Sequence, residues 1–194
     1  MNHWNDEQAL SYDDKWGELD FHRQIPSLAN VSAGYRIAEI GCGGGFLSLC
    51  LAQHAPGVNV LAIDPTAKMI HLAKMRQQKA NLLDSQLKFI QAGAEELKLD
   101  HASIDLVIAA FSVHHWQAPK YAMSLIFQGL KPGGRVWLSE DMNTPFEGDL
   151  NVDDSLKAHE GLKRLLKQSG FVNITESSNT SVEGDFLIVE AVKP

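Results

Sequence analysis

The chain has 194 residues, about one domain's length and enough to bury a sizeable core. Its 24 acidic and 17 basic residues give a formal net charge of −7 without a lysine- or arginine-rich run, so nucleic acid is disfavoured as a substrate. No apolar run approaches the ~20 residues of a membrane span. The first residues lack the order of a signal peptide, and two cysteines do not indicate a disulfide scaffold. A cytoplasmic protein is expected.

Short apolar runs alternate with helical patterns over the first two thirds of the chain. The run at 104–110 is almost wholly apolar, as expected for a strand covered on both faces of a parallel sheet. This alternation implies right-handed βαβ crossovers and a doubly wound sheet. The predicted strands are 35–40, 58–63, 87–90, 104–110 and 135–139, and the predicted helices are 47–52, 66–80 and 121–130, the last one stopped by 131–134.

The pattern changes toward the C-terminus. Residues 154–169 predict an amphipathic helix closed by Gly170, and 171–176 and 186–192 predict strands. About nine residues separate these strands, which leaves no room for a helix, so they are expected to pair antiparallel. We expect one α/β domain over residues 1–194. Residues 1–30 would be an N-terminal helical extension, and 35–192 a Rossmann-like core whose seven-stranded, mostly parallel sheet ends in an antiparallel hairpin.

A glycine-rich turn follows the first predicted strand. Gly41, Gly43 and Gly45 allow positive φ and a close approach of backbone to ligand, and the amides of the next helix can face that ligand. The dinucleotide fingerprint G-x-G-x-x-G would need a third glycine where Phe46 stands. Glu39 would repel a pyrophosphate but attract a ligand that carries an ammonium group. The turn therefore predicts a nucleotide-like cofactor with a cationic part.

Residues 39–45, Glu-Ile-Gly-Cys-Gly-Gly-Gly, resemble motif I of the class I S-adenosylmethionine-dependent methyltransferases. The resemblance implies that Glu39 attracts the ammonium of the methyl donor and that the turn admits its methionine part. Together with the segments described next it covers residues ~35 to 192. It is closest to the small-molecule branch, of the ubiquinone and menaquinone biosynthesis type. The cofactor-binding residues expected in and beside the turn are Glu39, Gly41, Cys42, Gly43 and Gly45.

Asp64 ends the second predicted strand. In this topology an acid at that place accepts hydrogen bonds from the two ribose hydroxyls of an adenosine. The alternative is a capping role for the helix predicted at 66–80, although Thr66 could do that instead. A ribose contact would suit S-adenosylmethionine and NAD equally. Pro65, which follows, is included in the expected cofactor site.

A third resemblance to the same family spans residues 93–116. Where relatives carry an aspartate that accepts the adenine amino group, this chain has Gly93. Adenine would then be read by the backbone around Ala94 or by Glu95. Phe111, at the end of the fourth predicted strand, completes this side of the expected site.

His114 and His115 follow the same strand, at the edge where ligands bind in such sheets. On an extended segment adjacent side chains point to opposite sides, and no other ligand lies at zinc-like spacing, so no metal site is expected. Either histidine could act as a base, or could simply pack behind the sheet. Glu140 and Asp141, after the fifth strand, could orient an amine or hydroxyl substrate or belong to a solvated loop.

Tyr12 and Trp16 are four residues apart in a predicted helix and so share a face. That helix could close over the cofactor as a lid, which would add both aromatics to the cofactor site, or it could cover the sheet edge. Residues 143–153 are a second candidate for a pocket wall.

The sequence therefore predicts methyl transfer from S-adenosylmethionine to a small-molecule acceptor by direct in-line displacement, with S-adenosylhomocysteine as product. A non-catalytic protein that binds these adenosyl ligands is one alternative. An NAD-dependent oxidoreductase is another, disfavoured by Phe46 and Glu39. The acceptor and the oligomeric state are not specified.

Overall fold

The structure, a computed structural model, describes residues 4–141 and 154–194. The chain packs as two compact units, residues 1–94 and 95–194. The expected single domain over residues 1–194 stays a prediction. Among the described residues, no helix is both long enough and apolar enough to span a bilayer.

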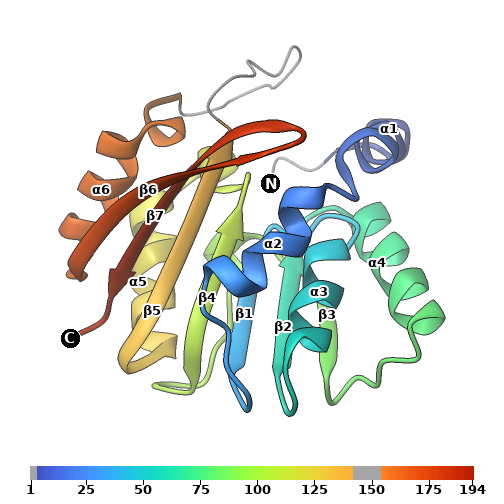
Figure 1. The fold of residues 1–194 in the computed structure, drawn as a ribbon, viewed down its shortest axis with the longest axis horizontal. Coiled ribbons are helices and arrows are strands. Elements are labelled where there is room, and N and C mark those ends of the chain that lie inside the picture. The colour runs from blue at the N-terminus through green and yellow to red at the C-terminus, as the bar shows by residue number, and fades with distance from the viewer. Residues whose placement is uncertain (1–3, 142–153) are drawn as a thin grey trace. The chain divides into compact units, whose positions relative to one another are not determined.

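The first unit contains a parallel three-stranded segment with helices in its connections (Figure 1). β1 pairs with β2, and β2 with β3, each parallel and without a register shift. Most residues of β1 and β2 are buried in succession, and the buried apolar side chains of the three strands include Ile37, Ala62 and Leu87. The elements are α1 (Asp6–Trp16), α2 (Asp20–Leu28), β1 (Arg36–Ile40), α3 (Phe46–His54), β2 (Asn59–Asp64), α4 (Ala67–Lys79) and β3 (Leu87–Gln91).

Helix α1 begins at a reciprocal cap. Asn5 accepts a hydrogen bond from the Gln8 amide at 2.9 Å, and the Gln8 side chain accepts one from the Asn5 amide at 3.0 Å. Such a capping box satisfies two amides that a helix leaves without internal partners. Helix α1 packs against α4, and α2 packs against α3. Two helices thus lie within residues 6–28, and the N-terminal extension expected over residues 1–30 stays a prediction.

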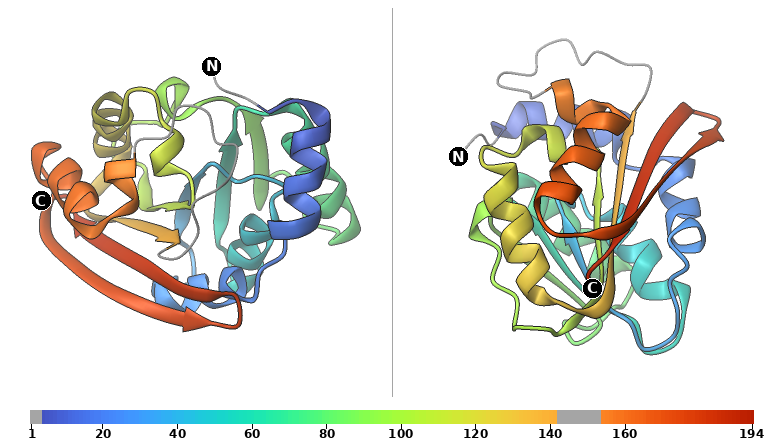
Figure 2. Two further views of the ribbon diagram at one scale, coloured as in Figure 1. Left: turned by 90° about the horizontal axis from the view of Figure 1, so that it is seen from above. Right: turned by 90° about the vertical axis from the view of Figure 1, so that its left-hand side faces the viewer.

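The second unit contains the remaining strands, with α5 and α6 on one face of β5, β7 and β6 (Figure 2). β4 and β5 are parallel, and β5, β7 and β6 are antiparallel neighbours. The core includes Leu106, Ile126 and Trp137, each fully buried. The elements are η1 (Ala94–Glu96, which begins at the last residue of the first unit), β4 (Ile104–Ala110), η2 (Val113–His115), α5 (Pro119–Gly129), β5 (Leu130–Asp141), η3 (Asp154–Lys157), α6 (His159–Gln168), β6 (Val172–Ser181) and β7 (Gly184–Val192).

The sheet has seven strands in the order β3-β2-β1-β4-β5-β7-β6, mostly parallel with the antiparallel C-terminal hairpin. The expected Rossmann-like α/β class is confirmed. The hairpin is longer than predicted, because β6 continues to Ser181 and β7 begins at Gly184. Residues 177–181 are all Ser, Asn or Thr, so they lack the apolar alternation of a strand. Their backbone pairing with β7 holds them extended.

Two larger differences from the prediction concern the start of β5 and the start of α6. β5 begins at Leu130, because Leu130 pairs with Ile104 ahead of an irregularity in the ladder. The helix predicted at 154–169 is interrupted at Ala158, whose backbone is extended. The carbonyl of Ser155 lies directly against Gly161, so the preceding turn folds back onto α6 at a residue that has no side chain.

Candidate cofactor site and a buried His–Glu pair

The glycine turn of the first unit connects β1 to α3, as predicted. Gly41, Gly43 and Gly45 have φ of 78°, 50° and 81°, so the expected positive φ is confirmed at all three. The amides of Gly41 and Cys42 donate to the Ile63 carbonyl at 2.8 and 2.9 Å, which ties the turn to β2. The turn is a fixed element anchored on the neighbouring strand.

Gly45 has a second reason to be glycine. A Cβ at this position would lie 2.7 Å from both the Ala73 Cβ and the Phe89 Cζ. The turn therefore approaches α4 and β3 more closely than any side chain would allow. The sequence pattern indicated the conformation of Gly45, and the structure adds this close packing.

Glu39 is the penultimate residue of β1 and is 2% exposed. The Ser48 hydroxyl, on α3, donates to Glu39 Oε2 at 2.5 Å. Burial raises the pKa of Glu39 to about 8. The Ser48 hydrogen bond opposes this rise, and the nearby charge of Asp64 adds to it. An acid in this state gains by meeting a positive charge, because a cation favours its ionised form.

Asp64 ends β2 and holds both neighbouring turns. Its Oδ2 accepts from the Gly43 amide at 3.0 Å, and its Oδ1 accepts from the Thr66 amide at 2.8 Å. Thr66 precedes α4, yet its side chain makes no capping bond and accepts instead from the Trp4 amide at 3.4 Å. Burial raises the Asp64 pKa, and the two backbone amides oppose the rise. The Thr66 side chain is a third hydrogen-bond donor to this carboxylate, which has about four lone-pair sites, so acceptor capacity remains for a ligand.

The turn is electrostatically acidic. The pKa of the buried Cys42 thiol lies well above its ordinary value, first because of burial and then because of the charges of Asp64 and Glu39. A thiol in this state stays neutral and packs as a small apolar group. Pro65 lies at the edge of the same site, where its carbonyl accepts from Gln91 Nε2 at 3.1 Å. Two carboxylates beside a glycine turn suit a ligand with positive charge and hydroxyl groups.

Tyr12 and Trp16 lie on α1 and are both partly buried. The Tyr12 ring is 4.4 Å from that of Trp4, and Lys15 Nζ lies 4.9 Å from the Trp16 ring. The predicted helix is confirmed, whereas a lid role for it stays a prediction. Sequence reasoning missed Arg76 on α4, whose guanidinium bonds to α1 and to the glycine turn. A single arginine within a helix gave no signal in the sequence.

Ala94 and Glu95 form the first residues of the short helix η1. Ala94 is buried. Within the second unit, Glu95 Oε1 accepts from the Ala118 amide at 2.9 Å, at the N-cap of α5. A carboxylate at this end of a helix is favourable because the helix dipole is positive there. The sequence pattern did not indicate this structural role.

Phe111 follows β4 with a φ of 54°. Bulky residues rarely adopt this left-handed conformation, which persists where the surroundings impose it and is frequent at functional sites. The Phe111 amide donates to the Ser139 carbonyl at 2.9 Å, and its ring lies 5.3 Å from that of Phe186. These contacts hold the turn that leads to the histidines.

His114 and Glu140 form a buried pair in the second unit. His114 Nδ1 lies 2.7 Å from Glu140 Oε2, and the two residues are 7% and 1% exposed. Burial raises the pKa of Glu140 to about 8, and His115 opposes the rise. Glu140 Oε1 has no hydrogen-bond partner among the described residues. Glu140 is thus not in a solvated loop, and its Oε2 lies within hydrogen-bond distance of His114 Nδ1.

The expectation that the two histidines point to opposite sides is wrong. Residues 113–115 form the 3-10 helix η2, so the strand geometry that the expectation assumed does not apply. The rings of His114 and His115 lie 4.1 Å apart. Within residues 4–141 and 154–194, no cluster of three or more His, Cys, Asp or Glu side chains is arranged to hold a metal ion. The pocket wall expected at 143–153 lies outside the described residues.

Comparison with known proteins adds sequence relatives and a structural neighbour. The ubiquinone biosynthesis O-methyltransferase of Schizosaccharomyces pombe is 31% identical over 121 residues, which is 62% of this chain and 43% of that protein. The S-adenosyl-L-methionine-dependent Diels-Alderase iccD of Talaromyces variabilis is 34% identical over 160 residues, 73% of this chain and 54% of that protein. The chain therefore spans about half the length of these curated relatives.

The fold is also that of a solved protein. The crystal structure of a SAM dependent methyltransferase from Aquifex aeolicus superposes with a TM-score of 0.76, covering 98% of this chain and 100% of that one at 16% identity. The model of the methyltransferase domain family matches residues 38–138, more than half of the chain, including the glycine turn, Asp64 and His114. The chain belongs to the methyltransferase domain family.

Proposed function

We propose that this chain is an S-adenosylmethionine-dependent methyltransferase that acts on a small-molecule acceptor. The observation that carries the proposal is the buried, acidic glycine turn of the first unit, where Glu39 and Asp64 flank backbone held at positive φ. The donor set fits the methyl donor, whose ammonium and sulfonium are positive and whose ribose offers two hydroxyls. It does not suit a pyrophosphate, because a negative ligand beside two buried acids opposes their ionised forms and gains no attraction from them.

Different residues in and beside the turn would contact different parts of the methyl donor. Glu39 would face the ammonium group, the backbone of Gly41 to Gly45 would border the methionine part, and the free lone pairs of Asp64 would accept from the ribose. The backbone at Ala94 would lie at the adenine, and Tyr12 and Trp16 would exclude water. When bound, the donor supplies an electrophilic methyl group to an O, N, S or C nucleophile.

The protein's own contribution would be alignment and dehydration. Holding two reactants in line supplies ~7–11 kcal/mol of barrier reduction without an acid or a base. A base is needed where the nucleophile arrives protonated. The His114–Glu140 pair of the second unit is the candidate for this role, because Nδ1 and Oε2 lie 2.7 Å apart, a distance at which a proton can pass between them. His115, whose ring lies beside that of His114, would tune the pair.

A small-molecule acceptor is supported by the relative named for ubiquinone biosynthesis and by the acidic net charge of −7. A second candidate function is adenosyl-ligand binding without methyl transfer. The relative named as a Diels-Alderase favours it, since that protein is named as S-adenosyl-L-methionine-dependent and not as a methyltransferase. An oxidoreductase that uses NAD is disfavoured by the acidic turn.

Thermal unfolding with S-adenosylmethionine, S-adenosylhomocysteine and NAD, compared side by side, tests the proposal. A ligand at 100 times its Kd stabilises the folded state by ~2.7 kcal/mol, which is readily seen as a rise in Tm. We expect a rise with the two adenosyl ligands, lost in Asp64→Ala, and no rise with NAD. Methylation of a panel of phenol, amine and thiol acceptors then separates the enzyme from the binding protein. A rise with NAD alone would contradict both.

A further inference from the structure

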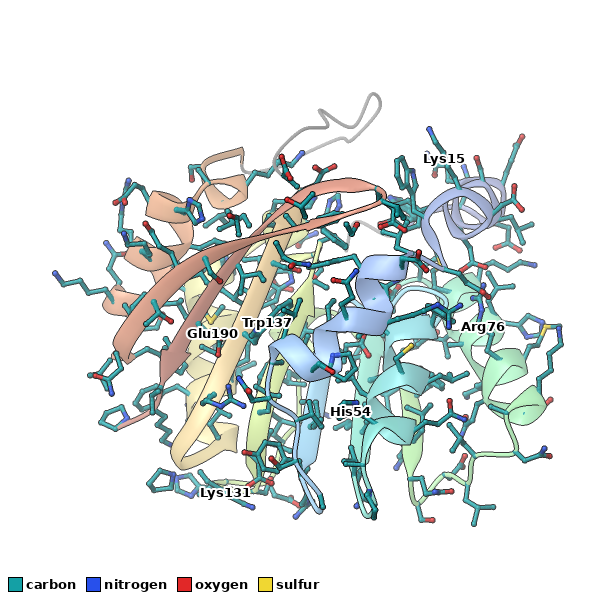
Figure 3. All side chains as sticks on the ribbon, viewed as in Figure 1. Lys15, His54, Arg76, Lys131, Trp137 and Glu190 are labelled. Atoms are coloured by element: carbon teal, nitrogen blue, oxygen red, sulfur yellow. The ribbon has the colours of Figure 1, made fainter. Side chains whose placement is uncertain are left out.

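Arg76 on α4 makes four hydrogen bonds to three separate segments of the first unit. Its Nη1 and Nη2 donate to the two carboxylate oxygens of Asp13 on α1, at 2.8 and 2.9 Å. Its Nε donates to Glu18 at 3.2 Å, and Nη1 also donates to the Gly44 carbonyl at 2.8 Å. Figure 3 shows Arg76 on the side of α4 that faces α1. One guanidinium thus links α1, the segment after it and the glycine turn.

This link differs from the other contacts between α1 and α4. The Asp13 and Arg76 side chains are 11% and 20% exposed, and their paired geometry is the strong form of an ion pair. The second ion pair, Lys68 with Asp6, spans 3.8 Å, and its Asp6 side chain is 80% exposed. A pair so exposed to water contributes little. Arg76 is therefore the principal polar tie between α1 and the rest of the unit.

Gly44 lies where Asp13 and Arg76 meet the glycine turn. Its φ is not positive, unlike those of Gly41, Gly43 and Gly45, so its backbone conformation does not require glycine. A Cβ at position 44 would instead collide with the Asp13 carboxylate and the Arg76 guanidinium. The absence of a side chain at Gly44 is what allows α1 and α4 to meet on the turn.

The bond from Arg76 also fixes a peptide plane. The Gly44 carbonyl and the Gly45 amide belong to one planar peptide group. The carbonyl accepts from Arg76, and the amide donates to the Cys42 carbonyl at 2.9 Å. Rotation of this peptide would break both bonds together. The position of α1 and the shape of the turn are thus coupled through a single side chain.

We propose that Arg76 is a positioning residue for the donor site: it holds α1, with Tyr12 and Trp16, against the glycine turn. The inference rests on the proposed function, because the turn is taken as the site of the donor. Asp13 and Trp16 are three residues apart and share a face of α1. Docking Asp13 on the turn therefore brings the aromatic face of the helix to the same place.

Gly44→Ala is the sharpest test, because it keeps every charge and an allowed backbone while it displaces Asp13 and Arg76. Arg76→Gln removes the tie directly, and Arg76→Lys keeps the charge but cannot bond to Asp13 through two nitrogens. Lys68→Gln is the matched control, since it removes the other α1–α4 ion pair and leaves the turn untouched. Two readouts are needed: amide hydrogen exchange over residues 6–16, and the Kd of S-adenosylhomocysteine by calorimetry.

We expect Gly44→Ala and Arg76→Gln to speed exchange in α1 and to raise the Kd about tenfold, equivalent to ~1.4 kcal/mol. Arg76→Lys should show exchange rates and a Kd between those of the two variants and those of the wild type. Lys68→Gln should have the exchange rates and the Kd of the wild type. Faster exchange with an unchanged Kd would show a merely structural tie, and unchanged exchange would show that Arg76 does not hold α1. Either result overturns this inference alone. A wild-type chain that does not bind the ligand overturns the proposed function as well.

Discussion

Each unit buries a glutamate at the penultimate residue of a strand, but the two are surrounded differently. Glu39 of β1 and Glu140 of β5 are 2% and 1% exposed, and burial raises the pKa of each to about 8. The partner of Glu39 is the Ser48 hydroxyl, which does not titrate near neutral pH. The partner of Glu140 is the imidazole of His114, a type of side chain that can both donate and accept a proton.

The difference separates two kinds of chemistry. Glu39 lies beside a second carboxylate and a glycine turn, so it gains most from a cation that arrives with a ligand. Glu140 already has a titratable partner and one oxygen without a hydrogen bond among the described residues, so it is suited to share or move a proton. Two glutamates of similar burial and similarly raised pKa are thus proposed to have different roles, which depend on their neighbouring groups.

Asp64→Ala should have the largest effect on ligand affinity. It should act on the cofactor site that contains Glu39 and leave the His114–Glu140 pair unchanged. It removes an acceptor for two ribose hydroxyls, and hydrogen bonds to a charged group contribute ~1.5–3 kcal/mol each. We expect affinity for S-adenosylhomocysteine to fall at least ~100-fold by calorimetry. Asp64→Asn, which keeps one acceptor oxygen, should fall less. Equal affinity in Asp64→Ala and wild type would remove the ribose role.

Gly45→Ala should be next, because it strains the turn that sets Glu39 apart from Glu140. The positive φ should lower the free energy of unfolding by roughly 1–2 kcal/mol, and the close contacts with Ala73 and Phe89 by roughly 1–3 kcal/mol more. Unfolding in urea measures the total loss. Gly34→Ala is the control, since its φ is 77° and nothing lies within 4 Å of its Cβ. An equal loss in both variants would mean that the close packing at Gly45 contributes nothing.

The fold and the glycine turn with its two acids were predictable from sequence, because the residues that determine them are close to one another in the chain. Positive φ at Gly41 and Gly45 follows from their residue type, and the acids at Glu39 and Asp64 lie next to the strands that position them. The Arg76–Asp13 pair joins residues 63 positions apart, and its bond to Gly44 needs an approach that no local pattern encodes.

The His114–Glu140 pair of the second unit depended on a local conformation that the sequence did not reveal. His114 was placed correctly after the fourth strand, but the 3-10 turn there brings its ring next to that of His115. The partner of His114, Glu140, comes from the next strand. Its acidic, loop-like surroundings in sequence suggested exposure as readily as burial.

The pH dependence of stability should show the likeness of the two glutamates. A carboxyl whose pKa is raised binds its proton more tightly when folded, so the free energy of unfolding falls as pH rises from about 4.5 through about 8. Glu39→Gln and Glu140→Gln should each remove part of this fall. At pH 9, where the wild-type acids are ionised, each variant should have a higher Tm than the wild type. A lower Tm at pH 9 in either variant would contradict the raised pKa there.

Lys163→Ala should have the smallest effect, outside both regions. Lys163 pairs with Glu160 and Glu176 at 3.0 and 2.9 Å on the surface, where water screens the attraction. Neither Tm nor ligand affinity should change within error. A fall in Tm as large as that of Gly45→Ala would mean that surface ion pairs contribute as much to stability as the buried groups do, which would contradict this expectation.

Calorimetric titration of wild type and Glu39→Gln with S-adenosylhomocysteine and with adenosine tests the central claim most directly. Adenosine lacks the ammonium group that Glu39 is proposed to attract. The account predicts that Glu39→Gln weakens S-adenosylhomocysteine about tenfold or more, ~1.4 kcal/mol, and leaves adenosine unchanged. An unchanged affinity for S-adenosylhomocysteine in Glu39→Gln, or an equal loss for both ligands, would contradict it.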